Sequence, residues 1–135
     1  MPELDYALLA DFVRSEGGLA HVIGASVDTI HVKEVPTGLN FGLLARITFA
    51  STECGRPHRL ELIFQDMDGK QIFNLTGVVE PTSIEGLPVG WDTGFLWAMN
   101  FGVPIPALGQ YVFHLLINDS LKKRLPIRVL TLPTG

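Results

Sequence analysis

Apolar residues recur at every second position along most of this chain, and that period of two limits the fold more than any other feature of the sequence. The alternation is clearest over residues 60–65 and 111–118. Because successive side chains of a β-strand point to opposite faces of a sheet, the pattern predicts strands with one face turned toward a core. No segment carries the 3.6-residue apolar stripe of a long helix, so we expect helix only as a turn or two.

Turn-forming residues separate nine such segments at intervals of roughly 8 to 12 residues. Short strands joined without crossover helices predict an all-β fold, most simply a two-sheet antiparallel β-sandwich, immunoglobulin-like or jelly-roll-like, of about eight to nine strands. A closed barrel is the alternative. The predicted strands are Leu4–Val13, Leu19–Ile23, Thr29–Val35, Phe41–Ala50, Leu60–Gln65, Gln71–Glu80, Gly94–Phe101, Tyr111–Asn118 and Leu125–Leu130.

Two hairpins are specified by their turn residues. Asp68 and Gly69 can adopt the positive φ angles of a tight turn between the strands on either side. Asn118, Asp119 and Ser120 predict a second reversal of the same kind with a longer loop.

A chain of 135 residues is expected to form one domain over residues 1–135, because this length can bury a core without help from a metal or a disulfide. Cys54 is the only cysteine, which excludes an intramolecular disulfide. A net charge of −4 without a long basic stripe gives no reason to expect nucleic acid or a membrane surface as a partner. The start has no secretory pattern and no apolar run is long enough to span a membrane, so we expect a cytoplasmic protein.

The stretch from residue 90 to residue 111 contains both tryptophans of the chain. Bulky side chains occupy the odd positions from 95 to 101, which predicts a core-facing strand rather than a ligand groove. Since Pro104 cannot donate to a ladder, this strand should end near Gly102. Trp91 precedes the alternating run, so we expect it on the surface.

Two local features are candidate sites. Sandwiches often present ligands to aromatic residues on end loops, so the loop carrying Glu85, Trp91 and Asp92 is a candidate site for a small molecule or a carbohydrate. His21 and His31 would lie opposite each other and could share a metal ion if their strands pair symmetrically about Ser26. The third metal ligand is left open among Asp11, Glu34 and His114.

The period of two also predicts apolar residues on outward faces. We expect Leu8, Ala10 and Phe12 to face the core, together with alternate residues of 43–47 and 60–64. Several aliphatic side chains of the same strands then lie on the outward face of the sheet. Monomers seldom leave a large apolar patch uncovered. We therefore expect a second copy of the chain to cover this patch in a homodimer, and the alternative is that the loop at residues 79–90 covers it within one chain. The expected interface residues are Ala7, Leu9, Val13, Leu44 and Ile63.

Three segments carry a resemblance to known proteins: LLADFVRSEGGLAHVIGASVDTI, DMDGKQI and VPIPALGQYVFHLLINDSLKKRLPIRV. They resemble a family of small single-domain bacterial β-sandwich proteins of unknown function, over almost the whole chain. Gly109, Tyr111 and Phe113 form a G-x-Y-x-F pattern that immunoglobulin-like domains also carry. The resemblance implies a bacterial sandwich of similar length and brings no catalytic residues.

No phosphate loop, dinucleotide fingerprint or nucleophile elbow occurs in the chain, so an enzyme is the weaker expectation and no cofactor is expected. We therefore predict a non-catalytic binding or interaction module that binds a protein partner and associates with itself. A small-molecule or carbohydrate binder at the Trp91 loop is the alternative, and a metal-dependent enzyme at His21 and His31 is the third possibility.

Overall fold

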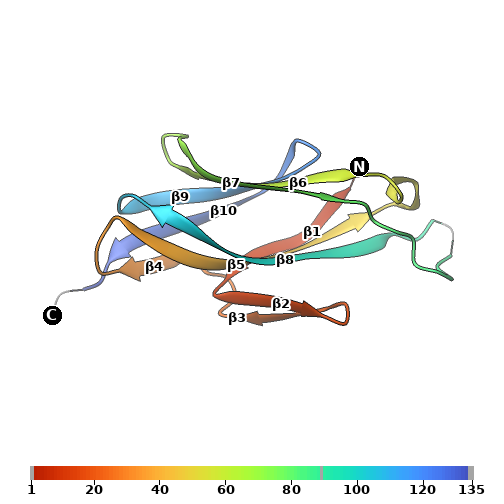
Figure 1. Cartoon of the computed structure of the whole chain (residues 1–135), viewed down its shortest axis with the longest axis horizontal. Coiled ribbons are helices and arrows are strands. Elements are labelled where there is room, and N and C mark those ends of the chain that lie inside the picture. The colour runs from red at the N-terminus through yellow and green to blue at the C-terminus, as the bar shows by residue number, and fades with distance from the viewer. Residues whose placement is uncertain (1, 89, 134–135) are drawn as a thin grey trace.

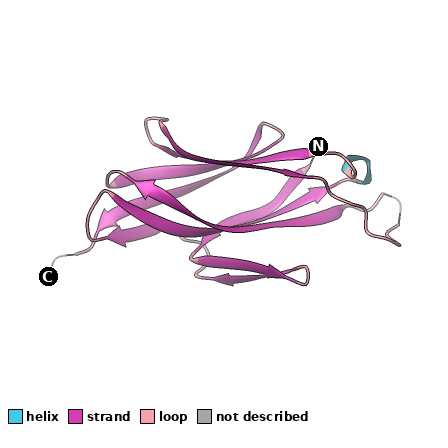
Figure 2. Cartoon of the chain, viewed as in Figure 1, coloured by secondary structure: helices cyan, strands magenta, loops and turns pink. Residues whose placement is uncertain are grey.

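A computed structural model describes residues 2–88 and 90–133 of the chain, and these residues form ten strands and one short 3-10 turn at Ser51–Glu53 (Figures 1 and 2). None of the described segments is a helix that is long and apolar enough to cross a membrane. The strands are β1 (Glu3–Ala10), β2 (Phe12–Glu16), β3 (Leu19–Ile23), β4 (Thr29–Val32), β5 (Thr37–Phe49), β6 (His58–Asp66), β7 (Gln71–Val79), β8 (Thr93–Ile105), β9 (Gly109–Ile117) and β10 (Ser120–Thr131).

Two sheets stack face to face, as the period of two predicts. One has three strands in the order β1-β5-β8, and the other has five in the order β4-β10-β9-β6-β7. Neighbouring strands are antiparallel except for the parallel pair of β4 and β10. The core lies between the sheets, where Phe41, Phe64 and Phe113 are almost fully buried and the ring of Phe113 contacts the other two rings.

The hairpin of β2 and β3 forms a third, two-stranded sheet on the outer face of the three-stranded sheet (Figure 1). Val13 of β2 packs there against Leu44 of β5. The side chain of Asn100 in β8 accepts a hydrogen bond from the N–H of Val13 at 2.9 Å and donates one to its carbonyl oxygen at 2.8 Å. Apolar packing and this paired hydrogen bond hold the hairpin against the sheet.

The first predicted strand is in fact two strands, and its predicted inward face is wrong. The chain turns at Asp11, between β1 and β2. Leu9 faces the main core, whereas Leu8 and Ala10 face the β2–β3 hairpin on the other side. Phe12 was expected in the core and is 46% exposed. When a strand is apolar on both faces, the alternation of its residues does not indicate which face points toward the core.

Both predicted hairpins are present. Gly69 adopts φ +85° in the turn from β6 to β7. The turn from β9 to β10 is tighter than expected, because Asn118 and Asp119 both have positive φ and form a two-residue reversal in place of a longer loop.

The strand of the aromatic stretch runs past Gly102 to Ile105. It does so because β8 is an edge strand, where Pro104 can direct its ring nitrogen away from the ladder. Trp97 and its bulky neighbours do pack against the core, but they are only partly buried because no strand covers the free edge of β8.

Candidate ligand-binding site

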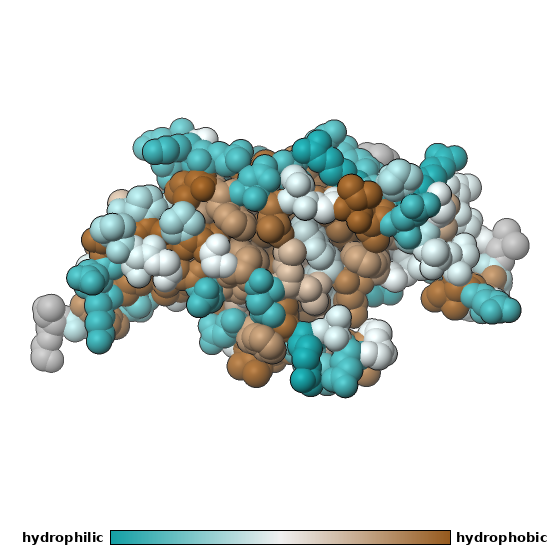
Figure 3. Space-filling model, viewed as in Figure 1, coloured by the Kyte–Doolittle hydropathy of each residue, from teal (hydrophilic) through white to brown (hydrophobic). Residues whose placement is uncertain are grey.

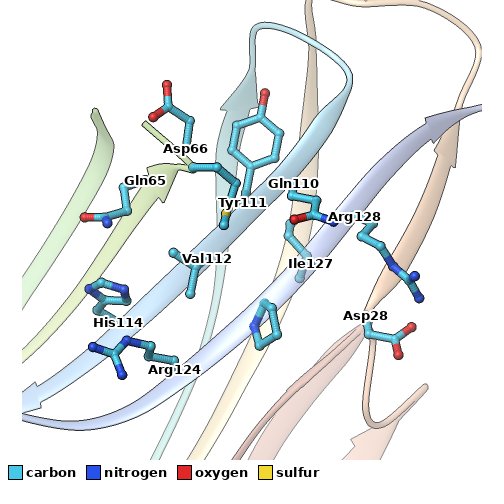
Figure 4. Close-up of a pocket in the computed structure, with 12 residues that line it drawn as sticks. Asp28, Gln65, Asp66, Gln110, Tyr111, Val112, His114, Arg124, Ile127 and Arg128 are labelled. Atoms are coloured by element: carbon cyan, nitrogen blue, oxygen red, sulfur yellow. The ribbon is translucent and has the colours of Figure 1, made fainter. Parts of the chain in front are cut away.

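A hollow of about 630 Å³ lies on the outer face of the five-stranded sheet, away from the three-stranded sheet (Figure 4). We call it the outer hollow. Its walls come from the outward-facing residues of β6, β9 and β10, the turn after β6 and the segment before β4. The lining residues used below are Asp28, Gln65, Asp66, Gln110, Val112, His114, Arg124, Pro126 and Arg128.

The strand register arranges these side chains in rows across the sheet. His114 of β9 lies opposite Arg124 of β10, and Gln110 lies opposite Arg128. Between these rows, Val112 lies opposite Pro126 on one side and opposite Gln65 on the other. The outer hollow therefore has an apolar middle, with a guanidinium group and an uncharged polar partner at each end.

His114 is held as a neutral imidazole at neutral pH. Partial burial and the positive charge of Arg124 lower the pKa of His114 from its ordinary value of 6.5. In this form the ring has one donor nitrogen and one acceptor nitrogen. An anion bound beside His114 and Arg124 would favour the protonated ring and raise its pKa.

The two arginines of the outer hollow are free to bind a ligand. Neither Arg124 nor Arg128 makes an ion pair with another described residue. Figure 4 shows Arg124 beside His114 at one end and Arg128 near Asp28 at the other. An unpaired guanidinium group presents several N–H donors in a plane, which suits a carboxylate or a phosphate.

The acidic residues at the rim differ in their roles. Asp66 stabilises the β6–β7 turn, because its Oδ1 accepts hydrogen bonds from the N–H groups of Asp68 and Lys70 at 3.0 and 2.9 Å. Asp28 is exposed and makes no hydrogen bond through its carboxylate with a described residue. Negative charge therefore lies at the Arg128 end, and the Arg124 end is the more favourable one for an anion.

The predicted Trp91 site lies elsewhere. Glu85, Trp91 and Asp92 are exposed in the connection between β7 and β8, and Trp91 is 60% exposed. Residue 89 of the same loop lies outside the described residues. None of the three side chains lines the outer hollow. The prediction that Trp91 is a surface residue is confirmed.

The structure separates the two histidines of the predicted metal site. His21 lies in β3 opposite Arg14, and His31 lies in β4 beside β10, in a different sheet. Over residues 2–88 and 90–133, no three His, Cys, Asp or Glu side chains gather in a group that could hold a metal ion. The symmetric pairing about Ser26 is wrong because β3 and β4 do not pair with each other.

Most of the predicted interface residues are covered within the chain itself. Leu9, Val13 and Leu44 are 2%, 2% and 3% exposed, because the hairpin of β2 and β3 covers one face of β1 and β5 and the core covers the other. Ala7 packs against the main core. Only Ile63 faces outward, half-buried beside His114 on the five-stranded sheet. Neither a partner copy nor the loop at residues 79–90 is needed to cover the others.

The outer hollow was not predicted from the sequence, although a signal for it was present. The predicted hairpin at Asn118 sets β9 against β10, and its outward positions carry His114 and Arg124. Each residue read alone is an ordinary outward residue of a strand. Pairing the outward residues of the two strands would have shown an apolar stripe with arginines at both ends.

The stacked sheets and the hydrogen bonds of Tyr111 together identify the structural class of the protein. The hydroxyl of Tyr111 donates a hydrogen bond to the carbonyl oxygen of Ala107, four residues earlier, at 2.6 Å and accepts one from its N–H at 3.3 Å. Such a hydrogen bond from a tyrosine back to the preceding connection is typical of immunoglobulin-like sandwiches. Two stacked sheets with this feature define an immunoglobulin-like β-sandwich.

The chain belongs to a family of unknown function, DUF6941, whose pattern matches residues 5–130. The solved structures include a similar fold, an immunoglobulin-like protein from Pseudomonas aeruginosa, with a TM-score of 0.50 and 15% identity over 96% of each chain. At this identity the likeness concerns the fold alone. No curated protein matches the chain. The predicted sandwich and the resemblance to a sandwich family of unknown function are confirmed.

Proposed function

We propose that this protein is a non-catalytic binding module and that the outer hollow is its ligand site. The observation that carries the proposal is the position of Arg124 and Arg128, neither of which forms an ion pair with another described residue, at the two ends of an apolar stripe formed by Val112 and Pro126. An unpaired guanidinium group beside a half-buried imidazole favours an anion, and the stripe favours an apolar body.

The ligand class is therefore a small organic anion, with its carboxylate or phosphate between Arg124 and His114 and its apolar part over Val112. A small-molecule binder was the alternative predicted from the sequence, and the proposal moves its site from the Trp91 loop to the sheet. The outer hollow favours this class over the Trp91 loop because its groups converge on one space. Residues 85, 91 and 92 instead lie exposed on a connection.

Thermal-shift and calorimetric titrations with octanoate, benzoate and inorganic phosphate test the proposal. We expect Arg124→Gln to weaken binding of the best anion by about tenfold or more, because a charge-assisted hydrogen bond contributes about 1.5–3 kcal/mol. Arg56→Gln is the matched control, since Arg56 is an exposed loop residue that does not line the outer hollow. Equal binding by both variants, or none by the wild type, would contradict the site.

Binding should also take up a proton. Because the bound anion favours the charged imidazole of His114, affinity should rise as the pH falls toward the pKa of His114, which lies below 6.5 in the free protein. Calorimetry in buffers of different ionisation enthalpy measures this uptake. It should vanish in His114→Gln, whereas His31→Gln, on the exposed part of β4, should retain it.

A further inference from the structure

The two edge strands on one side of the sandwich carry no charged residue. β7 and β8 contain 9 and 13 residues and no Asp, Glu, Lys, Arg or His. At the other side, β4 has only four residues, and β1 carries Glu3, Asp5 and a register shift. Natural sheets protect their edges by short strands, charges, prolines and bulges, and of these β8 has only Pro104, near its end.

Between β7 and β8 the core is partly open. The rings of Phe73 in β7 and Phe101 in β8 stack between the two strands, with centroids 5.7 Å apart. Elsewhere along this seam, Trp97 and Met99 pack on the core but stay partly exposed. Figure 3 shows brown and tan side chains across the middle of the molecule, with hydrophilic side chains above and below.

Pro104 reveals which backbone groups of β8 are unpaired. It lies opposite Gly38 in a ladder without register shifts, and a proline has no N–H to give to β5. Position 104 must therefore face the free edge, and so must every second residue before it. The same alternation at β1 agrees, because the carbonyl of Leu9, opposite Leu43, accepts a hydrogen bond from Val27 rather than from β5. The N–H groups of residues 96, 98, 100 and 102 thus point away from β5.

We infer that β8 pairs antiparallel with β8 of a second copy of this chain and joins two three-stranded sheets into one of six strands. A two-fold axis places the free edge of β8 in one copy beside the free edge of β8 in the other. The two edges have the same length, carry no charge and present the same unpaired backbone groups. Two copies that each carry a net charge of −4 repel one another, so an uncharged edge is where they can approach.

The full length of the strand is available for this pairing. A strand of 13 residues extends about 43 Å, so two antiparallel copies of β8 can form one continuous ladder. The outer hollow lies on the other sheet, so the edge of β8 can be tested without reference to any ligand.

Sedimentation velocity at micromolar concentration gives the first test. We expect a species of twice 14.8 kDa for the wild type. Ala98→Pro removes one free-edge N–H, and Met99→Lys places a charge in the seam; both should give folded monomers. Val78→Lys is the control, because Val78 is 72% exposed on the outer face of β7, and it should remain a dimer. A monomeric wild type, or a dimer that survives both β8 substitutions, would overturn the inference.

Hydrogen exchange of the wild type gives a second test that needs no variant to fold. Raising the protein concentration should slow exchange at the amides of residues 96, 98, 100 and 102 and leave the odd-numbered amides of β8 unchanged. Free-edge amides that exchange at the same rate at every concentration would exclude pairing through β8. A monomer whose β8 amides slow only when an extended apolar peptide is added would assign the edge to another protein and overturn the pairing of two copies.

Discussion

At the scale of single residues, hydrogen bonds between distant segments fix the ends of the sandwich. His58 lies before the predicted strand at residues 60–65, but it is the first residue of β6 and is 6% exposed. Its Nε2 lies 2.8 Å from the carbonyl oxygen of Glu53, and its Nδ1 lies 2.9 Å from the amide nitrogen of Asn118. Because the amide nitrogen of Asn118 donates, Nδ1 accepts, and Nε2 donates to the carbonyl oxygen of Glu53. The sequence could not show this, because the partners come from two other turns.

Tyr111→Phe should destabilise the fold by about 1 kcal/mol, because it removes both hydrogen bonds of the hydroxyl to Ala107 and leaves the ring in place. Tyr6→Phe is the matched control, since Tyr6 is 40% exposed and its hydroxyl makes no hydrogen bond with a described residue. Urea denaturation followed by circular dichroism measures both variants. Equal free energies of unfolding for the two variants would show that the hydroxyl of Tyr111 contributes nothing.

His114 should make the stability of the protein depend on pH. Its pKa in the folded state is lower than 6.5, so the unfolded chain binds the proton more readily. The contribution of the neutral ring is fully present above the unfolded pKa and is lost as the pH falls through about 6.5 toward the folded pKa. His114→Gln should therefore lose less stability than the wild type between about pH 7 and about pH 5. His31→Gln should follow the wild type, and the reverse order would refute the assignment.

At the scale of elements, local sequence predicts turns well and faces poorly. The turn at Asp68 and Gly69 was predictable because the residues that adopt it are adjacent. The inward face of β1 was not predictable, because the β2–β3 hairpin covers the other face of this strand. The hairpin is held there by Asn100, which is 87 residues away from its partner Val13. The outer hollow escaped prediction for the same reason, because its walls come from three strands and two connections.

Gly42→Ala should displace the β2–β3 hairpin. A Cβ atom at Gly42 would lie 2.9 Å from the backbone nitrogen of Val13 and 3.0 Å from Oδ1 of Asn100, closer than such atoms pack. We expect a loss of about 1–3 kcal/mol and faster hydrogen exchange in β2 and β3. Gly77→Ala on β7 is the control, because its Cβ would meet no atom within 4 Å. If Gly42→Ala leaves exchange in the hairpin unchanged, the close packing against Gly42 does not hold the hairpin.

At the scale of the whole molecule, a three-stranded sheet faces a five-stranded sheet. β7 and β8 are edge strands of the two sheets, and the rings of Phe73 and Phe101 stack between them. The same sequence pattern therefore produces two kinds of inward residue. Phe113 on β9, inside its sheet, is fully buried, and Trp97 on the edge strand β8 is only partly buried.

This inequality predicts different costs for two large substitutions. Phe113→Ala should destabilise by about 3–5 kcal/mol, the usual range for a fully buried ring, and Trp97→Ala by about half as much at protein concentrations low enough to keep the chain monomeric. Urea denaturation at the lowest concentration that circular dichroism allows measures both. If Trp97→Ala costs as much as Phe113→Ala in the dilute monomer, Trp97 lies in a closed core and the seam between β7 and β8 is not open.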